Sequence, residues 1–448
     1  MAYPNPGGGI SRLTVTGFKS IRAKQTIEIR PLTILAGVNS SGKSSMIQPL
    51  LLLKQTSDAS YDPGPLQLDG PNVSVTAVDQ ILSRGQTSRS QVRTFTIALV
   101  VDGRETTIKF GKDIDDDLKV LEYTGWYSPY QDVPVTLREG MTDAEVEAVL
   151  PRDLLRLYQQ LKESSRPTVK LHYRVQRDRF YLTPSIAMNT ESNGDGAVGI
   201  ALSEASLRNE LSRVIHLPAL RGNPKRTYPT TGAEKQFPGT FDIYTAGLIA
   251  SWRNHKQTTK IGQLRRDLQE LGLTWTAEAR QLVDTQVELL VGRLPHARPG
   301  GSRDLVNIAD VGFGVSQTLP VIVALLAAKT DQLVYLEQPE IHLHPRSQVQ
   351  FGNLIARAAN RGVRVIAETH SSLLIRSIQT LVAEGKIDPE NVALHWFARD
   401  PDSGVTQVTT ATLDDNGTFA DWPEDFDEVQ LESEANYLDA VARRSVRP

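Results

Sequence analysis

Short apolar runs open the chain. Residues 12–36 contain three of them, LTVTGF, TIEIR and LTILAG, and each has the length and composition of a β-strand. A helix is predicted to follow at about 42–55. Two alternating stretches surround Asp102 and Gly103 within 93–110, which predicts a β-hairpin. The first part of the chain is thus expected to form a mixed sheet with one helix.

The middle of the chain, from about 112 to 300, combines helical and extended patterns. Helices are predicted at 142–163, 241–255 and 259–271, and strands at 168–175 and 178–183. We interpret this region as a mainly helical insertion with connecting elements. Its helices lack a long heptad run, so no extended coiled-coil arm is expected.

From about residue 304, helices and strands alternate again. The predicted elements are a helix at 315–329, strands at 333–336 and 363–368, and a helix at 371–384. Alternation of this kind is typical of a parallel sheet. The tail, from about 391, is expected to hold a strand pair, an acidic stretch and a last helix near 430–443.

Composition limits the class of protein. Cysteine is absent from the 448 residues, which excludes disulfides and thiolate chemistry and suits a reducing cytoplasm. The 49 Lys and Arg residues nearly balance the 52 Asp and Glu residues, so bulk charge does not indicate a polyanion binder. The longest apolar runs, 319–328 and 49–53, are far shorter than a membrane span, and residues 1–12 lack a signal-peptide core. We therefore expect a cytoplasmic protein without a membrane segment.

The strongest motif is GVNSSGKS at 37–44, which matches the P-loop pattern GxxxxGK[ST] between an apolar strand and a helix. Gly37 and Gly42 let backbone N–H groups curl around phosphate oxygens, and the helix N-terminus adds its dipole. Lys43 is placed for the β- and γ-phosphates and Ser44 for magnesium. The predicted nucleotide-binding residues are Gly37, Asn39, Ser40, Ser41, Gly42, Lys43, Ser44 and Ser45.

Two later apolar strands end in residues that can carry chemistry. The strand at 333–336 is followed by EQPEIHLHP, which places Glu337 at its end. The sequence AETHSS places His370 at the end of another strand. The residues between them suffice for one helix and one strand, so the two strands can be neighbours. A solvated acidic turn and a structural histidine are the alternatives.

A glycine-containing segment, DVGFGVSQ at 310–317, lies directly before a predicted helix. Gly312 and Gly314 allow close backbone approach. Ser316 is predicted to open the helix, whose N-terminus can take a phosphate group. The alternative is a plain glycine turn with a serine N-cap.

Basic residues gather in two segments of the middle region. They are Arg213, Arg221, Lys225 and Arg226 in the first segment, and Arg253, Lys256, Lys260, Arg265 and Arg266 in the second. Both a nucleic-acid-binding surface and a solvated, salt-bridged face are consistent with this pattern.

These motifs, in this order, resemble those of ABC- and SMC-type ATPase heads, and the chain is most similar to OLD-like AAA-type ATPases of prokaryotes. The segments that carry the resemblance to one subgroup are LTVTGFKSIR (13–22), HLPALRGNPKR (216–226), DVGFGVSQTLPVI (310–322), EQPEIHLHP (337–345) and GTFADWPEDFDE (417–428). This subgroup ends in a small C-terminal domain of unknown function. Too few residues follow His370 for the Toprim domain of OLD nucleases alongside this tail, so no intrinsic nuclease is expected.

The resemblance implies an α/β fold, an ABC/SMC-type P-loop ATPase head with a mainly helical insertion. The implied domains are residues 1–111 and 301–400 as the two parts of the head, 112–300 as the insertion and connecting region, and 401–448 as a small tail.

The resemblance also implies roles for the motifs. Glu337 takes the magnesium position of the Walker B strand and Gln338 the general-base position, while His370 is the switch histidine that senses the γ-phosphate. Gly314 and Ser316 belong to a signature loop that completes the nucleotide site of a partner subunit.

Two further positions and one departure follow from the same resemblance. Lys19 is expected beside the phosphates, and Gln80 is expected to be the Q-loop glutamine near the metal. Glutamine at 338 replaces the usual glutamate and cannot accept a proton, although it can orient water. Glu340 stands in only if the turn brings it back to the site, so slow turnover is expected.

The expected cofactors are ATP and Mg²⁺, bound between two copies of the chain. The expected function is an ATP-driven dimerisation switch or sensor in anti-phage or genome defence, acting with a separately encoded effector protein. The alternative is a DNA-repair or DNA-end-binding SMC-like ATPase, which would show salt-dependent DNA affinity.

Overall fold

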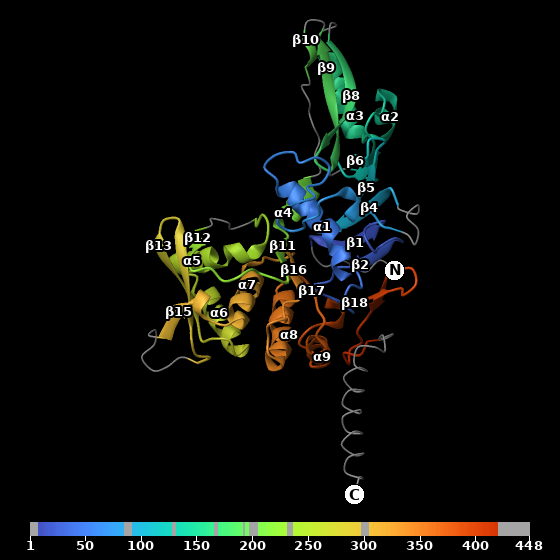
Figure 1. The fold of residues 1–448 in the computed structure, drawn as a ribbon. Helices are drawn as coiled ribbons and strands as arrows, with labels where there is room; N and C mark the ends of the chain where they lie inside the picture. The colour runs from blue at the N-terminus through green and yellow to red at the C-terminus, as the bar shows by residue number, and fades with distance from the viewer. Residues whose placement is uncertain are drawn as a thin grey trace.

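A six-stranded sheet forms the centre of the molecule in the computed structural model (Figure 1). The structure describes residues 8–84, 92–127, 131–164, 169–190, 193–196, 205–230, 236–296 and 304–419. In spatial order the strands are β11 (Ile215–Leu217), β16 (Leu333–Glu337), β17 (Arg364–Glu368), β3 (Leu32–Gly37), β18 (Val392–Arg399) and β19 (Thr406–Ala411). The first five are parallel, and β19 is antiparallel to β18. Their carboxyl ends therefore meet at one edge, next to the P-loop that follows β3.

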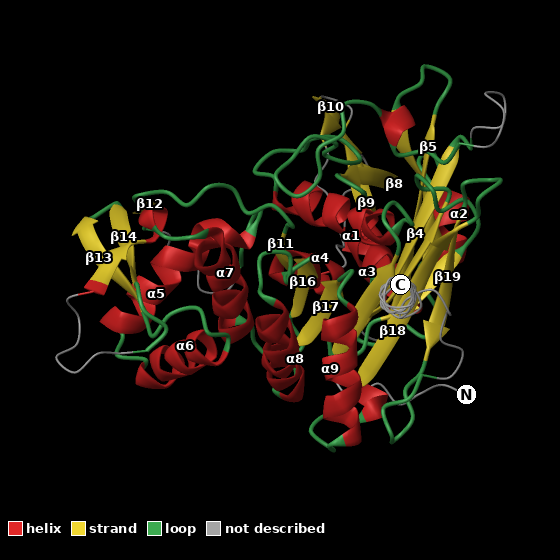
Figure 2. Cartoon of the chain, turned by 60° about the horizontal axis from the view of Figure 1, so that its bottom comes forward, coloured by secondary structure: helices red, strands yellow, loops and turns green. Residues whose placement is uncertain are grey.

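Helices cover both faces of this sheet, so its central strands are buried on both sides. One face carries α7 (Phe313–Ala327), α8 (Pro345–Asn360) and α9 (Ser372–Ala383), which lie side by side in Figure 2. The other face carries α1 (Lys43–Asp58). Alternate residues of β3 enter the two cores: Ile34 packs with the α7–α9 side and Leu35 with the α1 side.

A second, antiparallel sheet packs against the α1 side. Its strands are β2 (Gln25–Glu28), β1 (Ile10–Thr16), β4 (Thr94–Val101), β5 (Arg104–Lys112), β6 (Leu118–Gly125) and β7 (Val135–Leu137). The predicted hairpin is confirmed as β4–β5, and Asp102 and Gly103 at its turn both have positive φ, as a two-residue turn requires. Strands β6 and β7 come after residue 111, so this sheet continues into the middle region.

Residues 112–300 hold more strand than the sequence predicts. The remaining helices are α2 (Asp143–Val149), α3 (Arg152–Ser164), α4 (Ala205–Arg213), α5 (Thr245–Asn254) and α6 (Thr258–Glu270), with short 3₁₀ turns elsewhere. The strands are β8 (Val169–Asp178), β9 (Tyr181–Thr190), β10 (Asn193–Gly196), β12 (Tyr228–Pro229), β13 (Ala277–Val283), β14 (Gln286–Gly292) and, just beyond, β15 (Leu305–Asn307). Figure 1 shows β8–β10 projecting from the head, while β12–β15 form a separate sheet beside α5.

The helix expected at 142–163 is two helices. Leu150, which ends α2, has an extended backbone (ψ 144°) and precedes Pro151. A residue before proline is disfavoured in the helical region, so the chain must break there. Within the described residues, no helix combines the length and the apolar character that a bilayer crossing requires. The helix expected near 430–443 lies outside the described residues.

His395, on β18, is a buried histidine that should make folding stability pH-dependent. Its Nε2 donates to the Glu28 carbonyl at 2.8 Å and its Nδ1 accepts from the Thr410 hydroxyl at 2.9 Å. Burial lowers the pKa of His395 from its ordinary value of 6.5 to about 4. The folded state thus binds fewer protons than the unfolded state, so stability is lost as the pH falls from 6.5 towards 4.

We expect this titration to cost about 3 kcal/mol of unfolding free energy across that interval. His395→Gln should flatten the corresponding part of the pH profile, measured by urea unfolding. His255→Gln, at an exposed histidine, is the control and should leave the profile unchanged. Equal slopes in the wild type and His395→Gln would contradict the expectation.

Candidate nucleotide-binding site

The P-loop runs from the end of β3 to the start of α1 and needs glycine at both ends. Gly37 and Gly42 have φ values of 144° and 104°. A Cβ atom would lie 2.2 Å from the Phe397 carbonyl oxygen at the first position, and 2.2 Å from Thr406 Oγ1 at the second. Only glycine adopts this backbone at such close approach. The loop therefore packs directly against β18 and β19.

Lys43 is the first residue of α1, and its ammonium group lies inside the loop. Its Nζ donates to the carbonyl oxygens of Gly37 and Val38 at 3.0 and 2.9 Å. Burial lowers the pKa of Lys43, and the nearby Glu368 carboxylate partly opposes this. The cation is thus held at the point where the loop curls, without an ion pair that would neutralise it at close range.

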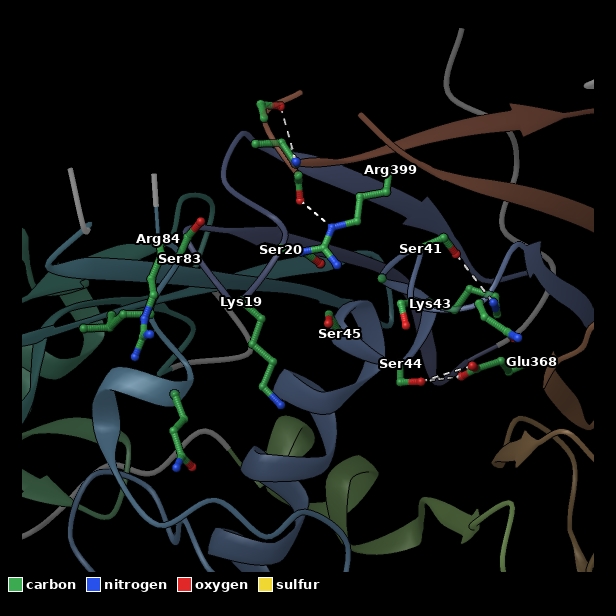
Figure 3. Close-up of a pocket in the computed structure, with 18 of the residues that line it drawn as sticks. Lys19, Ser20, Ser41, Lys43, Ser44, Ser45, Ser83, Arg84, Glu368 and Arg399 are labelled. Carbon is green, nitrogen blue, oxygen red and sulfur yellow. Dashed lines mark hydrogen bonds between the residues drawn. The ribbon is translucent and has the colours of Figure 1, made fainter. Parts of the chain in front are cut away.

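A cavity of about 830 Å³ surrounds this loop (Figure 3). That volume lies within the range typical of ligand sites. Of the residues predicted from the sequence, those that line it are Lys19, Asn39, Ser40, Ser41, Gly42, Lys43, Ser44, Ser45, Gln80, Gln338 and His370. Among the described residues, Gly37, Gly314, Ser316, Glu337 and Glu340 are outside this lining.

The end of β18 and the loop between β18 and β19 form one wall of the cavity, and the sequence did not predict that these residues belong to the site. Arg399, Ser403, Gly404 and Val405 line the cavity, and Figure 3 shows Arg399 extending into it. Arg399 Nε donates to the Gly404 carbonyl at 2.8 Å, which orders the loop. Ser83 and Arg84 also line the cavity, and Ser20 lines it beside the hairpin, where its Oγ lies 2.8 Å from Thr406 Oγ1. The sequence of the β18–β19 hairpin is polar and contains no motif that would predict a place in a binding cavity.

Glu337, at the end of β16, has partners outside the cavity. It accepts hydrogen bonds from His216 Nε2 at 3.0 Å and from the Ala219 backbone N–H at 3.2 Å. Asn72 Nδ2 donates to His216 Nδ1 at 3.0 Å, so the ring proton is on Nε2 and points at Glu337. The predicted contact of Glu337 with the magnesium position is therefore not formed in this arrangement.

Glu368 is the acidic residue that does meet the P-loop, and the sequence argument missed it. It ends β17, where it is the register partner of Glu337. Its carboxylate accepts from Ser44 Oγ at 3.0 and 3.1 Å and from the Tyr335 hydroxyl at 2.7 Å. Burial raises the pKa of Glu368. An acid at the end of an apolar strand, just before His370, was the signal available in the sequence.

Gln338 and Glu340 occupy different environments, which separates the two candidates for the base position. Gln338 has a φ of 40°, lines the cavity, and its backbone N–H donates to the Glu368 carbonyl at 2.8 Å. Glu340 is only 5% exposed and accepts from Thr369 Oγ1 and from the His370 N–H. Burial raises the pKa of Glu340. Gln338 thus faces the cavity, and Glu340 supports the turn that presents His370.

His370 lies beside the P-loop. It lines the cavity, and its pKa is lowered first by burial and then by the positive charge of Lys43. A neutral imidazole next to Lys43 can donate one hydrogen bond to a phosphate oxygen without adding charge.

Lys19 and Gln80 reach the cavity wall, where both have protein partners. Lys19 Nζ donates to Gln48 Oε1 at 2.6 Å, and burial lowers the pKa of Lys19. Gln80 ends the 3₁₀ turn Val78–Gln80, and its amide bonds twice with Thr76, at 2.9 Å each. The metal contact expected for Gln80 is therefore replaced here by a local turn.

The start of α7 differs from the expectation in one detail. Gly312 caps the helix, and Phe313 is its first residue, so Ser316 lies within the first turn and does not open it. Ser316 is 7% exposed, and its hydroxyl donates to the Phe313 carbonyl at 3.2 Å. Phe313, at 54%, is the exposed apolar side chain of this loop, and Gly312 beside it is exposed as well.

Within the described residues, four of the nine basic residues in these segments form ion pairs, among them Arg213 with Glu210. Arg226 bonds to Asp310, and Arg253 and Arg265 both reach Glu278. Arg221 is buried, so it is not a surface residue: its guanidinium donates to the Gln317 carbonyl at 2.7 Å and to the Glu337 carbonyl at 3.2 Å. These contacts agree with a salt-bridged face, and Arg221 instead ties the start of α7 to the end of β16.

Solved structures of SMC heads are similar over most of the chain. The Smc head of Pyrococcus furiosus, with an extended coiled coil and bound to the C-terminal domain of ScpA, has 11% identity and a TM-score of 0.45, over 97% of this chain and 99% of that chain. The Smc head of Pyrococcus yayanosii has 11% identity and a TM-score of 0.46, over 96% and 99%. The SMC head domain from Thermotoga maritima has 10% identity and a TM-score of 0.40, over 90% and 98%.

Two family models match parts of the chain, and no curated protein matches it. Residues 387–430, which include β18 and β19, match "Protein of unknown function (DUF3696)". Residues 290–376 match the family described as "AAA domain, putative AbiEii toxin, Type IV TA system". This segment contains α7, β16 and β17, and β17 pairs directly with the P-loop strand β3. The part of the chain that is similar to a AAA domain thus forms one sheet with the P-loop strand.

Proposed function

We propose that the chain binds ATP with magnesium at the P-loop, hydrolyses it slowly, and uses the ATP-bound state to close a homodimer. The observation that carries this proposal is the convergence of Lys43, Ser44, Gln338 and His370 on one cavity. They come from three separate parts of the chain, the P-loop, the end of β16 and the end of β17, so their meeting is a property of the fold.

The residues present fit a nucleoside triphosphate. Backbone N–H groups of the P-loop and the start of α1 bind phosphate oxygens, and Lys43 can exchange its two carbonyl contacts for phosphate contacts. Ser44 offers a hydroxyl to magnesium, which neutralises charge on the β- and γ-phosphate oxygens when it is bound. His370 donates to the terminal phosphate, and Gln338 orients the attacking water.

The dimer follows from the position of the signature loop. Residues 312–316 do not line their own cavity in the described structure, and Phe313 exposes an aromatic ring that lies against the His342 ring, with centroids 5.9 Å apart. A loop that ends in a helix N-terminus and is free of its own site is suited to the nucleotide of a second copy.

Phe313→Asp should therefore prevent ATP-driven dimerisation, because it places a carboxylate against the partner's triphosphate. We expect the mass measured by light scattering to double with ATP in the wild type and to stay monomeric in the variant. Leu282→Asp is the matched control, since Leu282 is similarly exposed on the β13–β14 hairpin. If ATP changes the mass of neither the wild type nor the control, the dimer proposal is wrong.

The biological role that we propose is anti-phage or genome defence with a separately encoded effector protein. The match of residues 290–376 to a family whose description names a toxin of a toxin–antitoxin system supports this role. The test is a phage-plating assay in cells that carry the chain with its neighbouring genes. Protection that is lost with Lys43→Ala supports the proposal, and equal plaque numbers with and without the chain contradict it.

A further inference from the structure

The carboxylate next to the magnesium-binding serine belongs to β17, one strand away from the acid that the sequence motif indicates. Glu368 contacts Ser44 Oγ with both carboxylate oxygens and is itself only 4% exposed. Glu337, the motif acid on β16, contacts His216 and Ala219 instead. Because β17 lies between β16 and β3, Glu368 is the nearer of the two to the P-loop.

We propose that Glu368 is the acidic residue that positions Ser44 for magnesium and completes the outer shell of the bound ion. This inference rests on the proposed binding of ATP and magnesium. In this proposal the acid that faces the metal is Glu368 at the end of β17 and not Glu337 at the end of β16. Glu337 instead anchors the loop that follows β11.

The hydrogen-bond pattern explains how Glu368 acts. A serine hydroxyl has one proton and two lone pairs, so a proton donated to Glu368 leaves the lone pairs of Ser44 for a cation. Tyr335 donates to the same carboxylate at 2.7 Å and is fully buried, which fixes the carboxylate orientation. The carboxylate also places negative charge where a divalent ion would arrive. Such outer-shell partners orient a metal ligand and raise metal affinity.

Glu337 has a geometry that suits a structural task. Its two oxygens are used by the His216 ring and the Ala219 N–H, and His216 stacks on the Tyr335 ring with centroids 5.4 Å apart. The Glu337 side chain is thus anchored to β11 and its following loop. Moving it to the P-loop would break both hydrogen bonds.

The test measures the dependence of ATP affinity on magnesium by calorimetry. For each protein the readout is the ratio of the ATP dissociation constants in excess EDTA and in excess Mg²⁺. We expect Glu368→Gln to lower this ratio by about 10- to 100-fold, the usual effect of losing an outer-shell partner, while ATP affinity in EDTA changes little. The Mn²⁺ electron paramagnetic resonance signal of the ATP complex should weaken in parallel.

Two comparisons make the result specific. Asp267→Asn neutralises another buried carboxylate, which pairs with Arg357 outside the cavity, and should leave the ratio unchanged. In the double variant Ser44→Ala/Glu368→Gln, the two losses should not add, because both act on one ligand. Additive losses would show that Glu368 acts independently of Ser44 and would overturn the positioning role.

The remaining outcomes are also decisive. If Glu337→Gln abolishes the magnesium dependence and Glu368→Gln leaves it intact, the β16 acid is the metal-facing residue and the inference is overturned. A loss in both variants supports a shell shared by the two acids, with Glu368 in it. If the wild type binds no ATP even in EDTA, the proposed function itself fails. If it binds ATP without any effect of magnesium, only the inference fails.

Discussion

Lys43→Ala is expected to lower ATP affinity by roughly 30- to 5,000-fold. The ammonium group is the buried cation of the P-loop, and truncating one partner of a buried, hydrogen-bonded charge pair costs about 2–5 kcal/mol. Among the described residues this cation contacts P-loop oxygens alone, through the carbonyls of Gly37 and Val38 and, more distantly, Ser41 Oγ at 3.5 Å. It is therefore available for phosphate oxygens. Isothermal titration calorimetry with ATP measures the effect directly.

Two other lysine variants serve as controls for the effect of Lys43→Ala. Lys19→Ala should weaken ATP binding less, because Lys19 lines the same cavity but is tied to Gln48. Lys386→Ala, at an exposed lysine that pairs with Glu384, should have no effect. An unchanged ATP affinity in Lys43→Ala, with the protein folded by circular dichroism, would remove the P-loop from the nucleotide site.

Gln338→Glu is expected to raise the rate of ATP hydrolysis by up to about 10²–10⁴-fold, the usual contribution of a general base. The wild type has an amide at the cavity wall, and an amide can orient water but cannot accept its proton. We therefore expect wild-type turnover well below the roughly 10 s⁻¹ that is the median of enzymes. Steady-state phosphate release, measured for both proteins at saturating ATP, tests the difference.

Glu340→Gln separates the two possible bases. Glu340 is buried under the turn of Thr369 and His370, so its neutralisation should change the rate little while Gln338 remains the residue at the cavity. The opposite result, in which Glu340→Gln abolishes hydrolysis with ATP binding intact and Gln338→Glu has no effect, would make Glu340 the catalytic carboxylate.

The parts of the candidate site that could be predicted from the sequence are those formed by consecutive residues. The P-loop was predictable because strand, loop and helix are consecutive, and their glycines are required by the backbone itself. His370 could be singled out because it follows an apolar strand, which the structure has as β17. In contrast, the choice between Glu337 and Glu368 depends on which strand lies next to β3, and strand order in a sheet is not encoded by spacing along the chain.

The difference between local pattern and tertiary contact also explains which elements of the middle region could be predicted from the sequence. Amphipathic helices such as α6 were found by their periodicity. In contrast, β13 is buried only in its first half, and β14 carries the apolar Leu290 between the buried Leu289 and Val291, so neither sequence shows a clear alternation. Arg221 appeared as one of several basic residues, and only its burial between α7 and β16 shows that it is internal. Tertiary contacts of this kind decide burial, and they are absent from the local pattern.

The contact between β19 and the P-loop has a consequence for biosynthesis. Thr406 donates its hydroxyl to the Ser41 carbonyl at 2.8 Å, across 365 positions of the chain. The P-loop leaves the ribosome before its neighbours β17, β18 and β19 are made. N-terminal segments emerge first, and contacts between distant segments form slowly. The nascent chain therefore carries an incomplete pocket around the P-loop until these three strands have been synthesised. A truncated product that lacks the hairpin of β18 and β19 should be an aggregation-prone species rather than a smaller working ATPase.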